Sequence, residues 1–275
     1  MKKKTARLYG GVLAAVIALT ATPAWAQFQP QGISDPATGE RYHIEAAIGL
    51  WSPNADMEVS SEQFGIPGTR IDFERDLGLK DQRFPEMHLT LRPAKKHKFR
   101  FQYIPIKYEQ GPFVVSRDII FNGQLYTVGV NVNSELDWKA YRFGYEYDFI
   151  SRDRFFIGFV LDFKYTDVSA GLEVPGFVAE SIHAAAPIPA IGGIFRAYIV
   201  PNISVTGEVT GFSVPEGLIE ETRGQYVDVD FYGTVNFTNY VGVMVGYRSL
   251  DVGYTVETDF GDFRLNGFYL GGVFR

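Results

Sequence analysis

Large apolar and polar residues alternate regularly along residues 141–165. Every second residue from Tyr141 to Phe149 is aromatic, and after a short polar turn the alternation resumes from Phe155 to Tyr165. Because successive side chains of a β-strand point to opposite faces, this pattern predicts a hairpin with one aromatic face. The opposite face carries charge or glycine at most positions. Strands that expose an apolar face to lipid and a polar face to the inside of a barrel have this pattern.

The same rule, applied to the whole chain, predicts ten strands. Their ranges are 41–51, 83–92, 98–108, 141–149, 155–165, 187–200, 203–213, 226–237, 240–252 and 263–274. The expected fold is an all-β, transmembrane, antiparallel up-and-down β-barrel of about ten strands. Eight or twelve strands are the alternatives, because the first two long connections contain strand-like runs of their own.

The connections between these strands are of two kinds. Four are short: 94–97, 150–154, 201–202 and 238–239. Five are longer: 52–82, 109–135, 166–186, 214–225 and 253–262. In outer-membrane barrels the short turns are periplasmic and the long loops are extracellular. With an even number of strands, both termini are then expected on the periplasmic side.

Two of the long connections have predictable local structure. Asn122-Gly123 lies between the apolar runs 119–121 and 125–132, which is a strong signal for a type I′ hairpin. We expect this hairpin to extend above the membrane without adding spanning strands. The alternating charges of residues 70–76 predict a solvated hairpin in the first loop.

Proline and aromatic residues are placed consistently with this topology. Proline cannot donate to a β-ladder, and Pro187 and Pro189 fall at the predicted extracellular end of the sixth strand. Aromatic rings favour the membrane interface. Six are expected beside the periplasmic turns: Tyr42, Phe99, Phe149, Phe155, Phe237 and Phe274.

The first 26 residues predict a cleaved secretory signal peptide. A basic start is followed by the apolar run 8–20 and by the small residues Ala24 and Ala26 at the cleavage positions. The apolar run is shorter than the roughly 20 residues of a membrane-spanning helix. We therefore expect residues 27–275 to form the barrel as a single domain.

Charge and composition exclude several classes of function. Without the four basic residues of the signal peptide, the chain keeps 22 of its 26 Lys and Arg against 32 Asp and Glu, a net charge of about −10. Nucleic-acid binding requires a basic surface, so no nucleic-acid partner is expected. The chain has no cysteine, which excludes disulfides and thiolate metal sites. No cofactor or metal motif is present, and the oligomeric state is not predicted.

The last predicted strand carries a resemblance to a known family. Residues 267–274 combine glycines with alternating apolar residues and a near-terminal aromatic ring. This segment resembles the C-terminal assembly signal of bacterial outer-membrane β-barrels, with Arg275 as a departure because the aromatic residue is usually the last. The matching positions are Gly267, Phe268, Leu270, Gly272 and Phe274. The resemblance implies a place in the bacterial outer membrane, contact with its lipid and lipopolysaccharide, and insertion by the barrel-assembly machinery.

The interior of a ten-stranded barrel is narrow enough for inward side chains to fill most of it. Inward charges and one histidine are expected at Glu45, Glu86, His88, Arg92, Arg100, Arg142, Glu146, Asp148, Asp162, Lys164, Arg196, Glu208, Asp228, Asp230 and Arg248. Acids and bases deprived of water favour pairing. The expected function is a structural barrel plugged by these pairs, or a narrow polar pore, with extended extracellular loops.

An enzyme is the competing class. Omptin-like proteases are also ten-stranded and use acids and a histidine at the extracellular rim; Asp228, Asp230 and His183 superficially resemble such a set, although no omptin motif matches. A hydrolase that modifies lipid A would also work at this rim, and the chain carries no signature of one. No catalytic residue is therefore assigned, and the alternative is a rim-located outer-membrane enzyme.

Overall fold

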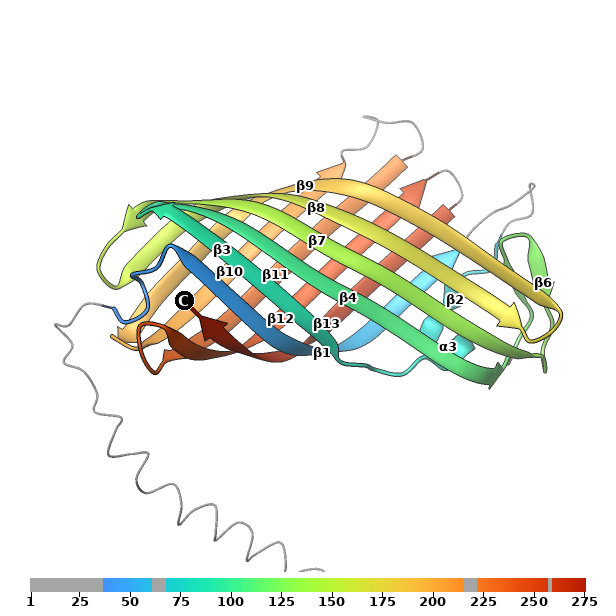
Figure 1. Cartoon of the computed structure of the whole chain (residues 1–275). Helices are drawn as coiled ribbons and strands as arrows, with labels where there is room; N and C mark the ends of the chain where they lie inside the picture. Colours follow the sequence, from blue (N-terminus) through green and yellow to red (C-terminus); the bar gives the residue numbers. More distant parts are fainter. Residues whose placement is uncertain (1–36, 61–67, 215–221, 257–258) are drawn as a thin grey trace, which may run out of the picture. The chain divides into compact units, whose positions relative to one another are not determined.

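Ten long antiparallel strands form a closed barrel in the computed structural model, which describes residues 37–60, 68–214, 222–256 and 259–275 (Figure 1). The strands are β1 (Ile44–Ser60), β3 (Phe84–Ala94), β4 (His97–Val114), β7 (Asn131–Ser151), β8 (Phe155–Val174), β9 (Val178–Val200), β10 (Ile203–Val214), β11 (Thr222–Asn236), β12 (Val241–Val256) and β13 (Asp259–Phe274). Each pairs with the next one along the chain. The predicted fold class and the count of ten strands are confirmed.

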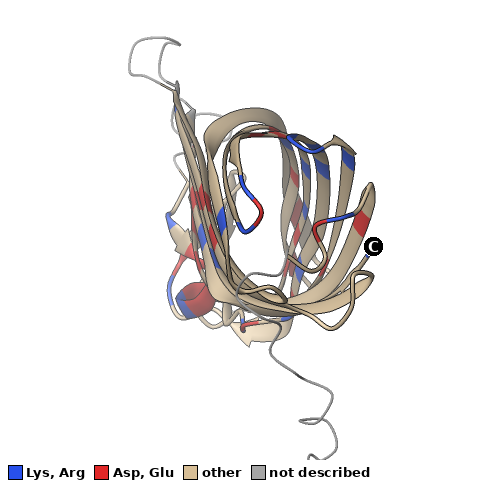
Figure 2. Ribbon diagram, turned by 90° about the vertical axis from the view of Figure 1, so that its left-hand side faces the viewer, with Lys and Arg blue, Asp and Glu red and all other residues tan. Residues whose placement is uncertain are grey.

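The first and last strands close the sheet. β1 and β13 are paired from Ala46↔Phe274 to Ser60↔Phe260, so neither strand is left as an open edge. Figure 2 looks into the barrel and shows its wall returning on itself. Closure gives each of the ten strands a paired neighbour on both sides, which lipid favours because it offers backbone groups no hydrogen bonds.

The two faces of the wall differ as the alternation predicts. Outward residues expose large apolar side chains, among them Ile48 (58% exposed), Phe143 (52%) and Phe268 (69%). Inward residues of the same strands, such as Arg142, are buried. The prediction that the Tyr42 ring lies at the membrane interface is wrong. Tyr42 precedes β1 and lies under Arg92 and Arg275, whose guanidinium carbons are 5.3 and 5.5 Å from its ring centre.

Several strands extend beyond their predicted ends into segments expected to be loops. β8 and β9 stay paired as far as Val174↔Val178, so residues 166–186 form strands joined by a tight turn. His183 therefore lies on β9 opposite Ser169, and Pro187 and Pro189 lie within β9. The pattern missed these extensions because their outward residues are small or polar, and an apolar alternation marks only the part of a strand that meets lipid.

Smaller elements gather at the end of the barrel opposite the short turns, and we call them the loop module: β2 (Ile71–Asp72), α3 (Phe73–Leu77), β5 (Ile119–Phe121) and β6 (Gln124–Tyr126). The β5–β6 hairpin has the predicted turn, with φ of 50° at Asn122 and 76° at Gly123. Residues 70–76 form β2 and α3 instead of the predicted solvated hairpin.

Two features explain the change from the prediction for residues 70–76. Asp72 caps α3 by accepting a hydrogen bond from the Arg75 N–H at 2.8 Å, and Gly78 ends the helix with φ of 69°. Phe73 and Leu77 on α3 are buried.

No helix in the described part of the chain is long and apolar enough to cross a membrane.

Phe159 tests the assignment of faces. It lies on the outer face of β8, opposite Tyr147 and Gly193 and midway between the outward residues Phe155 and Phe163. Phe159→Arg should lower the free energy of unfolding in lipid vesicles by about 2–4 kcal/mol, because a guanidinium there faces hydrocarbon. Denaturant titration measures this loss. Phe159→Leu is the control and should cost much less. Equal stability of the arginine variant and the wild type would show that this face does not meet lipid.

Asp76 gives the loop module a pH dependence. Burial raises the pKa of its carboxyl, but hydrogen bonds from Arg117 and from the Asp72 N–H, with the charge of Arg117, outweigh burial and leave the pKa below its ordinary value. This stabilisation is present above the unfolded pKa of about 3.9 and is lost as the pH falls through the lower folded value. Pepsin should therefore begin to cleave residues 69–80 as the pH falls below about 4.

The variant Asp76→Asn removes the charge at neutral pH. A neutral protease should cut its loop module at pH 7 while the barrel strands stay intact. Resistance equal to that of the wild type at pH 7 would contradict a role for the Asp76–Arg117 pair.

Candidate functional site

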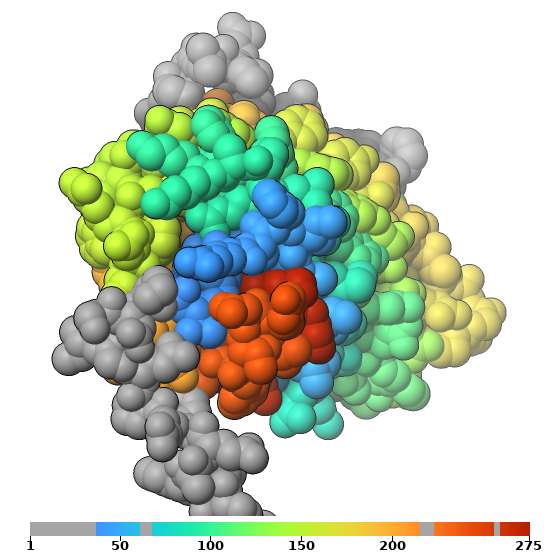
Figure 3. All heavy atoms as spheres, turned by 60° about the vertical axis from the view of Figure 1, so that its left-hand side comes forward, coloured from blue at the N-terminus to red at the C-terminus, as the bar shows by residue number. Residues whose placement is uncertain are grey.

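The barrel end that carries the short turns is covered by residues 37–43. The Thr38 N–H donates to the Pro201 carbonyl at 2.7 Å, and the Gly39 N–H donates to Asn239 Oδ1 at 3.1 Å. Glu40 then reaches inside, within 2.9 Å of Arg92 and 3.2 Å of Arg196. Figure 3 shows the blue atoms of this segment and of β1 packed beside the orange and red atoms of the last strands. The alternation did not identify Glu40 because it precedes the first strand.

The last residue completes this mouth of the barrel. Arg275 is 6% exposed at its side chain and donates from Nε to Glu45 at 2.5 Å and from Nη1 to Asn236 at 2.8 Å. Arg275 lies beyond the apolar alternation of β13, and its contacts depend on the folded mouth. For this reason the sequence pattern did not mark it as part of the interior.

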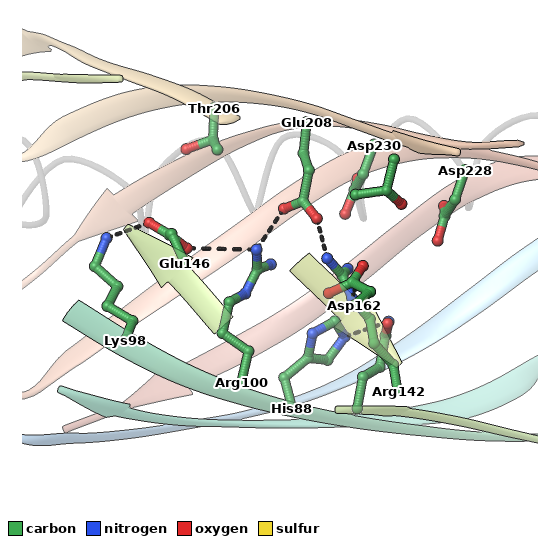
Figure 4. Close-up of polar contacts among 12 residues, drawn as sticks. His88, Lys98, Arg100, Arg142, Glu146, Asp162, Thr206, Glu208, Asp228 and Asp230 are labelled. Carbon is green, nitrogen blue, oxygen red and sulfur yellow. Dashed lines mark hydrogen bonds and ion pairs between the residues drawn. The ribbon is translucent and has the colours of Figure 1, made fainter. Parts of the chain in front are cut away.

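A chain of ion pairs crosses the lumen above the mouth (Figure 4). Lys98 on β4 is 2.5 Å from Glu146 and 3.0 Å from Asp148, both on β7. Arg100 lies 3.4 Å from Glu146 and 2.7 Å from Glu208 on β10, so it connects opposite walls. Lys98 was not among the expected inward residues. It lies two residues before Arg100 and has the same inward parity, so the alternation rule could have identified it.

The ion pairs continue toward the middle of the barrel. Arg142 pairs with Glu208 and lies 2.8 Å from Asp162. Asp228 accepts two hydrogen bonds from Arg248, at 2.9 and 2.7 Å, and lies 2.8 Å from Lys164.

The remaining predicted residues lie around these pairs. His88 is 3.3 Å from Glu86, and the Tyr269 hydroxyl donates to Asp230 at 2.8 Å. With Glu40, Lys98 and Arg275, the predicted inward residues thus lie together inside the barrel, and we call this set the charged layer.

The charged layer leaves little free space. One cavity of about 70 Å³ lies within it, with Arg100, Arg142, Glu146, Asp230 and Tyr269 among the residues that line it. A water molecule in the liquid occupies about 30 Å³, so the cavity has room for a few waters. This space is much smaller than a pocket for an organic ligand.

An apolar layer fills the other half of the lumen, toward the loop module. Its members are Trp51, Ile104, Ile106, Tyr108, Leu136, Trp138, Leu250, Phe263 and Leu265, all buried. The Trp51 indole N–H donates to the Gly267 carbonyl at 3.2 Å, and the Trp138 and Phe263 rings are 5.9 Å apart. Only Leu136 and Trp138 of this layer lie outside the predicted strands. The other members have inward parity on predicted strands, but sequence reasoning named only charged residues and one histidine as interior, so it missed the apolar layer.

The set proposed for an omptin-like site does not assemble. Asp228 pairs in register with Thr210, which pairs with Gly192 on β9, and His183 lies nine residues further along that strand. At about 3.3 Å per residue the separation along β9 is roughly 30 Å. His183 instead lies 3.0 Å from Asp167 at an exposed position. Among the described residues, no cluster of three or more His, Asp or Glu side chains could hold a metal ion.

Arg142 tests the energetics of the charged layer. Arg142→Met leaves Asp162 and Glu208 short of their closest cation, and removing one partner of a buried ion pair costs about 3–5 kcal/mol. Lys107→Met is the matched control, since Lys107 lies at the surface between Glu109 and Glu135 and should show no measurable change. Denaturant unfolding in vesicles measures both. Equal stability of the two variants would contradict a tightly coupled charged layer.

Comparison with known proteins adds evidence on the fold. No protein-family model and no curated protein sequence matches the chain. Among solved structures, the outer membrane protease OmpT from Escherichia coli is similar at a TM-score of 0.55 and 9% identity, over 88% of this chain and 99% of that one. The attachment invasion locus protein Ail of Yersinia pestis gives a TM-score of only 0.36 at 9% identity, over 84% of this chain and 99% of that one. The chain thus has the fold of the bacterial outer-membrane β-barrels.

Proposed function

We propose that this protein is an integral outer-membrane barrel with a closed lumen, which anchors a folded extracellular module in the membrane. The observation that carries the proposal is the filling of the lumen by two successive layers, one of paired charges and one of packed apolar side chains. The proposed role is structural, and it does not require a solute to cross the barrel.

The outer surface supports the membrane placement. Exposed apolar side chains form a belt around the wall, and Tyr103, Tyr141 and Tyr165 form a row at its upper limit, with ring centres 4.8 and 6.3 Å apart. Beyond this row the outer face turns polar, with Lys107 and Asp167 exposed or half-buried. An apolar belt with aromatic rings at its edges is typical of barrels in the outer membrane.

The orientation follows from the unequal ends. Short turns gather at the mouth with residues 37–43 and Arg275, while the loop module lies at the other end. We place the mouth in the periplasm and the loop module outside the cell, as is usual for this fold.

The proposed assembly signal lies on the closing strand. Phe268, Leu270 and Phe274 face outward on β13, Gly267 directly precedes Phe268, and Gly272 lies between Leu270 and Phe274. In our proposal the assembly machinery binds this strand before it closes on β1. The signal peptide proposed for residues 1–26 lies outside the described residues.

The competing proposal is a rim-located enzyme. The likeness to OmpT supports the barrel fold and does not extend to chemistry at 9% identity. The acids and histidine considered for this role are about 30 Å apart along β9, so the enzyme proposal has no assembled set of residues to support it.

Planar-bilayer recording tests the closed lumen. The wild-type protein should insert without discrete conductance steps, because ions would have to cross the apolar layer. The double variant Trp51→Ala/Trp138→Ala removes both indoles from that layer and should show intermittent steps. Steady unitary conductance by the wild type would support the pore and contradict the plug.

Single cysteines test the orientation, since the chain has none of its own. Phe177 is 88% exposed at the β8–β9 turn, and Asn239 is exposed in the β11–β12 turn. Phe177→Cys should react with a membrane-impermeant thiol reagent on intact cells, and Asn239→Cys only after the outer membrane is breached. The reverse result would invert the proposed orientation.

A further inference from the structure

Pairing between β9 and β10 stops before either strand ends. The ladder runs from Ile203↔Val200 to Gly211↔Ile191 and then ceases. Beyond that point β9 stays paired with β8, and residues 212–214 of β10 stay paired with β11 (Figure 1). No ladder therefore joins residues 188–190 of β9 to residues 212–214 of the neighbouring β10, all within the described part of the chain.

This interruption lies at the depth of the apolar belt. Ile191 is opposite Leu161 on β8, and Pro189 is opposite Phe163, which is 52% exposed on the outer face. The next outward pair, Pro187↔Tyr165, includes a member of the tyrosine row. With the proposed orientation, the interruption is therefore in the outer leaflet, just below the headgroups.

A groove of about 760 Å³ occupies the interruption. Ile191 and Gly211 line it from the outer face, and Ala190, Phe212 and Tyr226 line it from positions with inward parity. The groove therefore enters the wall from the lipid side.

Proline reduces the cost of leaving this edge unpaired. Pro189 lines the groove and has no backbone N–H, and Pro187 lies two residues away on the same face. In sheets proline is found on edge strands, where no ladder bond is lost. An edge with fewer unpaired donors is better suited to an apolar occupant than to water.

We propose that this groove binds one acyl chain of an outer-leaflet lipid, which enters sideways between β9 and β10. The groove is continuous with the lipid-facing belt, most of the residues that line it are apolar, and acyl chains are the abundant apolar molecules at this depth. The headgroup stays at the level of the tyrosine row while the chain extends toward Phe212 and Tyr226. The proposal rests on the membrane placement given above and is independent of whether the lumen conducts.

The test uses two matched cysteines on β9. Ala190 and Ile194 both have inward parity and are 6% and 4% exposed, but Ala190 borders the groove whereas Ile194 faces Glu208 in the paired wall. The full-length protein is reconstituted in phosphatidylcholine vesicles that contain a fatty acid with a maleimide at the middle of its chain. Ala190→Cys should be modified at least tenfold faster than Ile194→Cys, as measured by intact-protein mass spectrometry.

Three further variants separate the possible causes of each result. Gly211→Phe fills the groove and should abolish the fast reaction of Ala190→Cys, whereas Gly207→Phe, on the same face of β10 within the paired wall, should leave it unchanged. Ile191→Cys, 65% exposed on the outer face, reports the membrane placement itself. If Ile191→Cys does not react, the membrane placement is wrong and the groove proposal falls with it.

If Ile191→Cys reacts but Ala190→Cys is no faster than Ile194→Cys, the groove does not admit a chain and only this proposal fails. Fast modification of Ala190→Cys by a small water-soluble maleimide, without modification by the lipid-borne one, would also overturn it, because the groove would then be water-filled. Heat-modifiable gel migration confirms that each variant is folded.

Discussion

The need to pair backbone groups in lipid determines most of this structure. A sheet with an open edge would leave N–H and C=O groups without partners, so β1 must meet β13 and the sheet must close. Once ten strands are closed, the alternation of side chains leaves a narrow lumen bounded on all sides. Side chains on the inner face then have little access to water, and each charge among them needs an ionic or hydrogen-bonding partner.

The lumen meets this requirement in two different ways. Near the mouth, acids and bases from opposite walls pair across the barrel, as in the connection from Lys98 through Glu146 and Arg100 to Glu208. Farther up, packed indole, phenyl and aliphatic groups exclude water in the manner of a soluble core. The two layers meet where the Arg248 guanidinium carbon lies 5.6 Å from the centre of a Trp51 ring and the Lys164 ammonium 4.2 Å from that of Tyr226. A barrel filled in this way is well suited to hold the loop module in place.

Sequence alternation predicted the strand count and the two faces, because lipid imposes a strict period of two on the residues it touches. The β5–β6 turn was predicted separately, from the turn residues Asn122-Gly123. The alternation failed where the constraint from lipid ends. The upper parts of β8 and β9 have small or polar outward residues such as Ala185 and His183, so they resembled a loop. The apolar layer was missed for a different reason. Most of its members, such as Ile106 and Leu265, have inward parity on predicted strands, but only charged residues and one histidine were taken as interior. Glu40 depends on a backbone path across the mouth, and no local pattern encodes that path.

Tryptophan fluorescence tests the closed, two-layered lumen most directly. Residues 27–275 contain only Trp51 and Trp138, and their side chains are buried at 0% and 2% exposure. In vesicles, the emission of a protein that comprises residues 27–275 should be resistant both to acrylamide in the water and to brominated lipid in the bilayer, because the indoles lie inside the wall and away from solvent. Strong quenching by acrylamide would contradict a closed lumen, and strong quenching by brominated lipid would contradict the assignment of the two faces.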